Sequence, residues 1–303
     1  MKKDNLKLID EAWLGLDVIE TDIFNPTSIL NPNEDDFHLK LSWLMSRPEY
    51  LPFLCHQILN IQLLPSQSLI INELWTRKFP MLVGSRGLGK SFKLALYSIL
   101  RGMLLPKRKI VIVGAAFRQS KVLFEYMETI WRNAPMLRDM CDSNSGPTRD
   151  VDRCTMRINE SVITCLPLGD GQKIRGQRAN DIIADEFASI PRDIFENVVA
   201  GFAAVSADPV QNVKRLSAKK KAAELGIELE TEEDNPEVKD NQIIISGTAY
   251  YDFNHFATYW KKWKAIIKSR GNIAKLTEVF GGEKPPETFD WRQYSIIRMP
   301  YEL

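Results

Sequence analysis

Residues 81–92 read MLVGSRGLGKSF, and this stretch decides the fold. Gly84 to Ser91 fit the pattern G-x-x-x-x-G-K-[ST] without a deviation. Glycines let such a loop turn its backbone N–H groups toward phosphate oxygens, and the helix that follows adds free N–H groups and a positive dipole end. Lys90 can then reach the β- and γ-phosphates, and the Ser91 hydroxyl can bind Mg²⁺. The stretch predicts a P-loop whose cradle is formed by Gly84, Ser85, Arg86, Gly87, Leu88, Gly89, Lys90 and Ser91.

The segments around this loop alternate between strand and helix patterns. Buried apolar runs, typical of strands covered on both faces, occur at 79–83, 108–116, 179–187 and 241–249. Helical apolar spacing occurs at 66–76, 90–105, 117–133 and 191–203. A hairpin is predicted to turn near Asn159 and Glu160. Strands and helices at this spacing predict an α/β fold with a mainly parallel sheet flanked by helices.

The pattern divides the chain into two parts. Residues 1–60 are predicted to form a helical lead-in or arm, and residues 61–303 the P-loop domain. Within that domain, 214–240 holds a basic run followed by an acidic one, which we interpret as a surface insertion. The apolar tail at 289–303 suggests a chain cut from something longer.

Composition sets the broad class of protein. The chain has 303 residues, 44% of them hydrophobic and 26% charged, with a net charge of +1, so a nucleic-acid surface would have to be a local patch. The four cysteines lack C-x-x-C spacing and the three histidines are scattered, which argues against a metal cluster or a disulfide framework. No signal peptide or membrane span is evident. These features predict a cytosolic protein without a membrane partner.

A P-loop needs a second acid at the tip of a neighbouring strand, and DIIADE at 181–186 supplies two. Asp185 is predicted to hold Mg²⁺ through water, and Glu186 to polarise the attacking water. Acidic residues after a strand also serve as helix caps, so the functional interpretation of the pair depends on the presence of the P-loop. Their order favours an ATPase with a built-in base over a GTPase, because the guanine-reading N-K-x-D is not found.

Other polar residues are candidates for weaker reasons. Ser246 and Thr248 lie at the end of a buried strand, where hydroxyls can sense the γ-phosphate, although polar residues more often end strands for turn chemistry alone. Arg86 lies inside the loop, and Arg175 precedes the acid-tipped strand, with Arg178 as a competitor. An arginine brought to a transferring phosphoryl group contributes ~10³–10⁵ in rate, whereas most single arginines only make surface contacts.

The segment HFATYWKKWKAIIKSR at 255–270 interleaves aromatic and basic residues. Such interleaving can bind nucleic acid. We favour the alternative that an amphipathic helix packs its aromatic side chains and exposes its lysines.

Five stretches in this order resemble the ATPase domain of bacteriophage large terminase subunits, the motors that package viral DNA. They are LPSQ at 64–67, SRGLGKS, AAFRQSKVLFEYM at 115–127, IRGQRANDIIADEF at 174–187 and IIISGTAYYDFNHFATYW at 243–260. The likeness spans roughly residues 60 to 270. The P-loop is generic, but the arginine inside it and the R-G before the acid strand make the combination specific.

The resemblance implies a RecA-like fold of the additional-strand, catalytic-glutamate class and the hydrolysis of Mg·ATP to move double-stranded DNA. It implies Gln67 near the adenine, Asp185 with Mg²⁺, Glu186 as base, and Ser246, Gly247 and Thr248 as a coupling motif. It also implies an arginine acting on the neighbouring subunit's nucleotide, which we carry to Arg175. The implied partners are a portal protein, a small terminase subunit and a homo-oligomeric ring of about five copies. The implied location is the host cytoplasm, with transient docking on the procapsid and absence from the mature virion.

The chain departs from the family in three respects. The C-terminal RNase H-like nuclease is expected to lie outside this chain, so cleavage is not expected of it. The insertion at 214–240 has no assigned role, and Ser-Gly-Thr replaces a run that is often richer in Ser and Thr. Two alternatives stay open at this point: a superfamily 2-like helicase, which needs a second RecA-like domain, and a regulatory switch that binds ATP without doing work.

Overall fold

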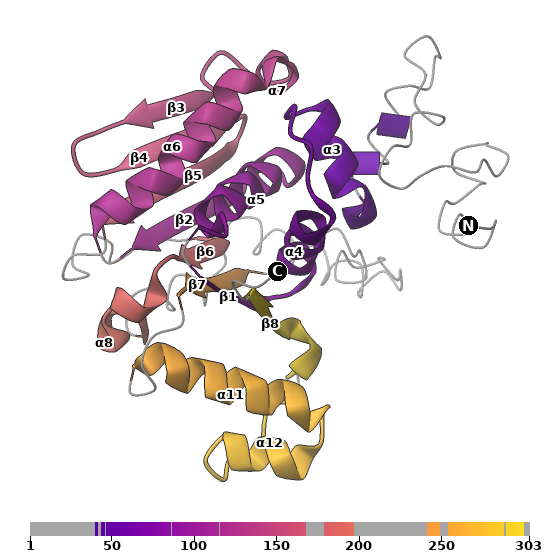
Figure 1. Cartoon of the computed structure of the whole chain (residues 1–303), viewed down its shortest axis with the longest axis vertical. Coiled ribbons are helices and arrows are strands. Elements are labelled where there is room, and N and C mark those ends of the chain that lie inside the picture. The colour runs from indigo at the N-terminus through magenta and orange to yellow at the C-terminus, as the bar shows by residue number, and fades with distance from the viewer. Residues whose placement is uncertain are drawn as a thin grey trace, which may run out of the picture.

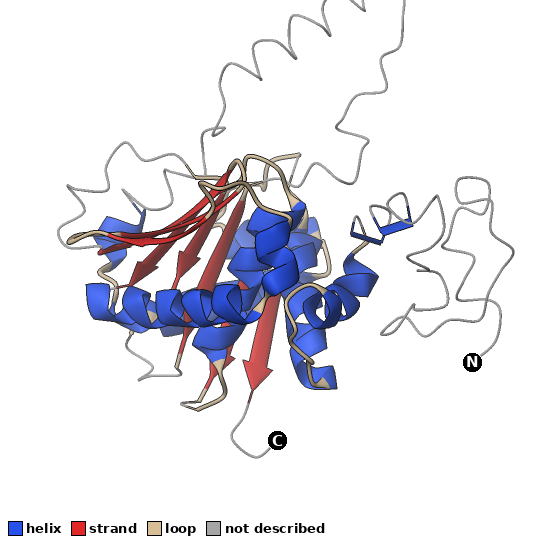
Figure 2. Cartoon of the chain, turned by 90° about the horizontal axis from the view of Figure 1, so that it is seen from above, coloured by secondary structure: helices blue, strands red, loops and turns tan. Residues whose placement is uncertain are grey.

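The strand before the glycine loop, β1 (Phe79–Gly84), lies inside an eight-stranded sheet within the residues that the structure describes. The structure is a computed structural model, and it describes residues 40–41, 44–45, 47–85, 87–114, 116–167, 179–196, 241–248, 254–287 and 289–299. The other strands are β2 (Lys109–Gly114), β3 (Gly146–Arg149), β4 (Cys154–Ile158), β5 (Ser161–Pro167), β6 (Asp181–Ala184), β7 (Gln242–Gly247) and β8 (Tyr294–Met299). Figure 2 shows the strands in red, running side by side among the helices.

The order of the strands is β3-β4-β5-β2-β6-β7-β1-β8. All pairings from β5 through β8 are parallel, whereas β3 and β4 are added to one edge as antiparallel strands. One strand, β7, separates the loop-bearing β1 from the acid-tipped β6. It is the additional strand that the predicted fold class requires. The prediction of a mainly parallel, RecA-like P-loop fold is confirmed.

Helices cover both faces of this sheet (Figure 1). One face packs on α3 (Leu51–Gln57), α4 (Pro65–Thr76), α5 (Lys90–Leu104) and α6 (Phe117–Asn133), with α7 (Pro135–Asp139) following. The other face packs on α11 (His255–Ser269) and on the segment that contains η4 (Phe187–Ser189) and α8 (Arg192–Ile194). The helix α12 (Ile273–Val279) follows α11. No helix in the described part of the chain is long and apolar enough to cross a membrane.

The sequence patterns locate most elements, but not all of them. The hairpin turns at Asn159 and Glu160 as predicted, between β4 and β5. The edge strands β3 and β8 are additional to the prediction, and the predicted helix at 191–203 is described only as far as Glu196, where it includes α8. The short helix η2 (Pro48–Tyr50) and α3 bury their apolar side chains in the same core as α4 and α5. The domain boundary at residue 60 stays a prediction, and the insertion at 214–240 lies outside the described residues.

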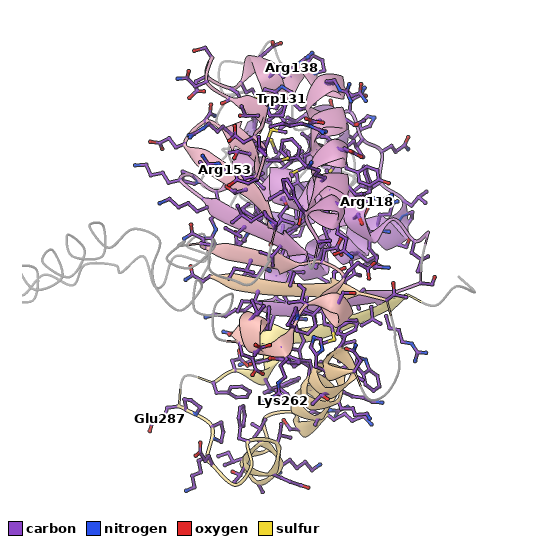
Figure 3. The ribbon with its side chains drawn as sticks, turned by 90° about the vertical axis from the view of Figure 1, so that its left-hand side faces the viewer. Arg118, Trp131, Arg138, Arg153, Lys262 and Glu287 are labelled. Atoms are coloured by element: carbon purple, nitrogen blue, oxygen red, sulfur yellow. The ribbon has the colours of Figure 1, made fainter. Side chains whose placement is uncertain are left out.

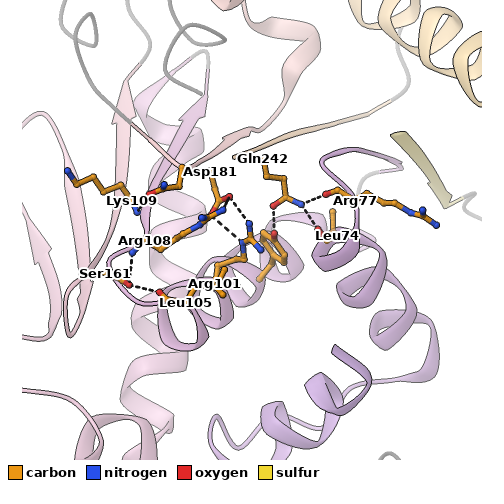
Figure 4. Close-up of polar contacts among 11 residues, drawn as sticks. Leu74, Arg77, Arg101, Leu105, Arg108, Lys109, Ser161, Asp181 and Gln242 are labelled. Carbon is orange, nitrogen blue, oxygen red and sulfur yellow. Dashed lines mark hydrogen bonds and ion pairs between the residues drawn. The ribbon is translucent and has the colours of Figure 1, made fainter. Parts of the chain in front are cut away.

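A buried polar network joins the sheet to its helices at the N-terminal ends of β6 and β7 (Figure 4). The Asp181 carboxylate accepts hydrogen bonds from Arg101 Nη2 at 2.8 Å and from Arg108 Nε at 2.8 Å. The amide of Gln242 donates to the carbonyl oxygens of Leu74 and Arg77. Burial alone would raise the pKa of Asp181, but the two guanidinium charges outweigh it and hold that pKa below its ordinary value. The network therefore stays ionised and ties α4, α5, β6 and β7 together.

Replacing Asp181 with Asn is expected to lower the free energy of unfolding by about 3–5 kcal/mol, because two buried guanidinium groups lose their carboxylate. Urea unfolding at neutral pH measures the effect. Glu128→Gln is the matched control, because Glu128 bonds the more exposed Arg149 at 2.8 Å, and such a pair contributes about 0–1 kcal/mol. Equal stability losses in the two variants would contradict the prediction.

Candidate functional site

Three strand ends bring the predicted site residues together. Strands β6, β7 and β1 are parallel neighbours, so the chain leaves all three at the same edge of the sheet. Val83 pairs with Gly247, and Ala184 pairs with Ile245, so the P-loop, Asp185 with Glu186, and Ser246 to Thr248 follow at similar heights. Residues far apart in the sequence thus form one cluster.

The P-loop connects β1 directly to the first turn of α5. Gly87 has φ = 86° and Gly89 has φ = 65°, in the left-handed region that glycine adopts without strain. Gly89 is the residue that caps the N-terminus of α5, so the free N–H groups of this helix open onto the loop. The local geometry is that of an anion cradle at a helix N-terminus.

Lys90 is folded back over the loop. Its Nζ donates to the carbonyl oxygens of Gly84 at 2.9 Å and Ser85 at 3.1 Å, and to the hydroxyl of Thr248 at 3.3 Å. The side chain is buried. Lys90 therefore links the P-loop to the end of β7, and phosphate oxygens could replace these neutral acceptors with a charged one.

Asp185 is a buried carboxylic acid directly after β6. Burial raises its pKa from the ordinary value of 3.8 to about 6, and the charge of Glu186 adds to this rise. The backbone N–H of Glu186, the nearby hydroxyl of Ser246 and the charge of Lys90 oppose the rise. At neutral pH the site thus holds a desolvated carboxylate that lacks a full counter-charge.

Three polar atoms in the described part of the site are buried without a hydrogen-bond partner: Ser85 Oγ, Asp185 Oδ1 and Ser246 Oγ. Such atoms cost free energy unless a ligand or water satisfies them. No cluster of three or more His, Cys, Asp or Glu side chains occurs among the described residues. Mg²⁺ does not need one, because it binds through one or two protein oxygens together with water and phosphate. The residues present fit a Mg²⁺-bound nucleotide.

The raised pKa of Asp185 predicts that Asp185→Asn stabilises the nucleotide-free protein. A carboxyl group with a raised pKa favours folding below its unfolded-state value near 4, and this contribution is lost as the pH rises through about 6. We expect a gain on the order of 2–3 kcal/mol at pH 8, falling to about half at pH 5. Urea unfolding in EDTA at both pH values measures it. Asp181→Asn is the matched control of opposite sign, and a loss of stability for Asp185→Asn at pH 8 would contradict the prediction.

Glu186 follows Asp185 in a backbone conformation that is rare for a residue with a side chain. Its φ is 47°, in the left-handed region. Such a conformation costs on the order of 1–3 kcal/mol and persists only where the surrounding contacts enforce it. Glu186 is only partly buried, so solvent has access to it. The left-handed backbone of Glu186 therefore follows directly after Asp185 at the end of β6, and its role as base stays a prediction.

For the other predicted site residues, the structure gives less information about their roles. Gln67 Oε1 accepts from the backbone N–H of Leu64 at 3.0 Å, which is a cap at the N-terminus of α4, so its place near adenine stays a prediction. Ser91 lies in the first turn of α5 directly after Lys90, where the predicted Mg²⁺ ligand should be. Arg86, Arg175 and Arg178 lie outside the described residues, and their roles stay predictions.

The sequence reasoning missed a second lysine at the loop. Lys93 is buried, and its Nζ donates to the carbonyl oxygen of Leu88. Burial lowers the pKa of Lys93, and the nearby charge of Lys90 lowers it further. Its position three residues after Lys90, on the same side of α5, was the available signal.

The aromatic and basic segment forms α11, as the packing interpretation predicted. Phe256 and Trp263 are buried in the core beneath the sheet. The lysines of this helix are exposed, and Lys262 is labelled at its surface in Figure 3. Lys264 Nζ lies 4.4 Å from the ring centroid of Trp260. Phe256 and Trp263 therefore serve packing, with Tyr259 and Trp260 partly buried against the same core.

Comparison with known proteins gives one family match. The model of the N-terminal part of the T4-like type of terminase large subunit matches residues 81–270, more than half of the chain. No curated protein sequence matches the chain.

Solved structures whose chains follow a similar path in space include large terminases. The ATPase domain from Thermus phage P74-26 shares 13% identity at a TM-score of 0.46, over 81% of this chain and 83% of that one. The large terminase of another thermophilic bacteriophage shares 10% at 0.44, over 77% of this chain and 45% of that one. The ADP complex of that second terminase gives 10% and 0.43, with 77% and 44% covered. The match thus spans less than half of the second terminase. The TM-scores lie below 0.5, so the fold is assigned from the strand order and the loop.

Proposed function

This chain belongs to the family of T4-like phage terminase large subunits, and we infer that it hydrolyses Mg·ATP to drive double-stranded DNA into a viral procapsid. The observation that carries the proposal is the meeting of three strand ends, which brings a P-loop lysine, an Asp-Glu pair and a threonine into one cluster. A cluster of this kind supplies the phosphate contacts, the base and a sensor for the phosphate that is lost.

Nucleotide binding begins with the loop. The backbone N–H groups of the P-loop and the N-terminus of α5 bind the phosphates, and Lys90 exchanges the carbonyl oxygens of Gly84 and Ser85 for phosphate oxygens. Ser91 and Asp185 would hold Mg²⁺, which neutralises charge on the β- and γ-phosphates when bound. Binding thereby places charged oxygens beside Lys90, in an environment where the screening by water is weak.

Hydrolysis then needs a base that faces the γ-phosphate. Glu186 orients a water molecule and accepts its proton as the water oxygen bonds to phosphorus and the bond to the ADP oxygen breaks. Lys90 stabilises the negative charge that gathers on the phosphate oxygens during transfer. The products are ADP and inorganic phosphate, and the proton passes from Glu186 to solvent.

The contact between Lys90 and Thr248 supports a coupling role for Ser246, Gly247 and Thr248. Thr248 shares Lys90 with the P-loop carbonyls, so any movement of Lys90 toward phosphate changes this contact. Because β7 lies between the P-loop strand β1 and the acid-tipped strand β6, its end lies between the P-loop and the Asp-Glu pair. We propose that loss of phosphate reaches the DNA-moving parts of the motor through this strand.

Assembly completes the proposal. The family resemblance implies that Arg175 acts on a neighbouring subunit's nucleotide, with Arg86 or Arg178 as alternatives. It also implies a ring of about five copies on the portal, a small terminase subunit as partner, cytoplasmic assembly and a nuclease activity of the longer protein. A superfamily 2-like helicase or a regulatory switch would not package DNA.

A packaging experiment tests the proposed function. Procapsids carrying a portal are mixed with the full-length protein, linear double-stranded DNA and ATP, and the DNA that becomes resistant to DNase is measured. Protection is expected with ATP and not with a non-hydrolysable analogue. Protection that is independent of hydrolysis, or turnover of ATP without protection, would contradict a packaging motor.

A further inference from the structure

The backbone directly after Glu186 is held by side chains from a distant helix. His255 Nε2 lies 3.0 Å from the carbonyl oxygen of Phe187, and Asn254 Nδ2 donates to the carbonyl oxygen of Ala188 at 3.0 Å. A carbonyl oxygen only accepts, so His255 must carry its proton on Nε2. The two residues that follow the left-handed Glu186 are therefore both fixed from the N-terminal end of α11.

Asn254 is itself held in one orientation. Its Oδ1 accepts from the backbone N–H of Phe256 at 2.9 Å and so caps α11, which turns the amide Nδ2 toward Ala188. The amide group thus uses its acceptor for the helix and its donor for the catalytic segment. A substitution can remove the second contact and keep the first.

Aromatic packing reinforces the same junction. The buried Phe187 ring lies 4.9 Å from the His255 ring and 5.8 Å from the Phe256 ring, measured between centroids. A Cβ atom at Gly247 would lie 3.2 Å from Phe256 Cε1 and 3.5 Å from the backbone nitrogen of Phe187. The end of β7, the start of α11 and the segment after Glu186 are packed too closely to move independently.

We propose that Asn254 and His255 are positioning residues for the Glu186 carboxylate. They hold the carbonyl oxygens of Phe187 and Ala188 and thereby keep Glu186 in its left-handed conformation, aimed at the site of water attack. Without these contacts the backbone relaxes and the carboxylate shifts. The inference rests on the proposed function, in which Glu186 activates water.

The test compares the effect of each substitution on kcat with its effect on nucleotide binding. Asn254→Asp retains an oxygen that caps α11 but replaces the donor to Ala188 with a second acceptor. We expect kcat to fall by about 10–100-fold, because a misplacement of about 1 Å at a catalytic group costs up to ~10²-fold. The KM for ATP and the Kd for ADP should be unchanged. If the aspartate variant does not fold, Asn254→Ser replaces it in the test. Serine can still cap α11 but has no amide donor, so we expect the same fall in kcat.

Two further sets of variants complete the design. Asn272→Asp is the matched control, because Asn272 Oδ1 caps a different helix, α12, at 3.1 Å from the backbone nitrogen of Lys275. It should keep the wild-type kcat. His255→Leu should lower kcat, and His255→Gln, which can still donate, should restore most of it.

The outcomes separate the inference from the function. Wild-type kcat in Asn254→Asp and His255→Leu, beside an inactive Glu186→Gln, would overturn the positioning role and leave the function standing. Wild-type turnover in Glu186→Gln would overturn the role of Glu186 as base and the inference with it, whereas absence of ATP hydrolysis in the wild-type protein would overturn the function itself. A parallel loss of ADP binding and turnover in the Asn254 variants would show a general structural role and would also overturn the inference.

Discussion

Replacing Glu186 with Gln is expected to lower the rate of ATP hydrolysis by about 10²–10⁴-fold, the usual contribution of a general base. Glutamine keeps the size of the side chain and one carbonyl oxygen but cannot take the proton of the attacking water. Binding should persist, because in the proposed mechanism the P-loop and Lys90, and not Glu186, contact the phosphates. The variant should therefore hold ATP without consuming it.

Rapid-quench measurement of phosphate release in a single turnover checks this expectation, with the Kd of a fluorescent ATP analogue measured in parallel. Glu196→Gln is the matched control, because Glu196 lies in the same segment but pairs with Arg192 at 2.9 Å on the surface. It should hydrolyse ATP at the wild-type rate. Wild-type turnover in Glu186→Gln would show that another group activates the water.

Replacing Lys90 with Ala is expected to lower turnover by about 10²–10³-fold, as the loss of one preorganised donor at a developing negative charge does. Unlike the change at Glu186, it should also weaken ATP binding, because in the proposed mechanism Lys90 contacts the phosphates before and during transfer. The substitution also removes the contacts of Lys90 to Gly84, Ser85 and Thr248, so the link between the P-loop and the end of β7 is lost.

Titration with the ATP analogue and steady-state turnover separate these two effects of Lys90. Lys109→Ala is the control, because Lys109 lies at the exposed start of β2 and bonds Asn180 through its backbone N–H, which the substitution keeps. Unchanged analogue binding in Lys90→Ala would contradict the placement of this side chain at the phosphates.

Local chemistry explains how much of the fold was predictable. The glycine pattern, the β-branched runs and the helical spacing each act within a few residues, so β1, β2, β6 and β7 and the helices α5 and α6 follow from the sequence. The edge strands depend on distant partners. Gly146 to Arg149 is largely exposed and gains its strand form only from pairing with β4, and Tyr294 to Met299 gains it from pairing with β1.

The features of the site also divide into those that the sequence predicts and those that depend on tertiary packing. The sequence predicts Lys90, Asp185 and Glu186 as site residues because phosphate chemistry demands those residue types at strand ends, and the structure brings the strand ends together. The left-handed conformation of Glu186 and its support by Asn254 and His255 could not be predicted, because they depend on the way in which α11 packs against the segment after β6. The burial of Lys93 likewise follows from the tertiary packing around α5.

The most direct test of the central claim is the Mg²⁺-dependent rate of ATP hydrolysis per chain, measured against protein concentration with and without double-stranded DNA. If Arg175 completes a neighbour's site, dilute wild-type protein should hydrolyse ATP weakly. The rate per chain should rise with concentration and with DNA, and it should stay low in Arg175→Ala. An ATP-driven motor that assembles in this way predicts that result. A rate independent of concentration and DNA, or no hydrolysis at any concentration on DNA-bound procapsids, would contradict it.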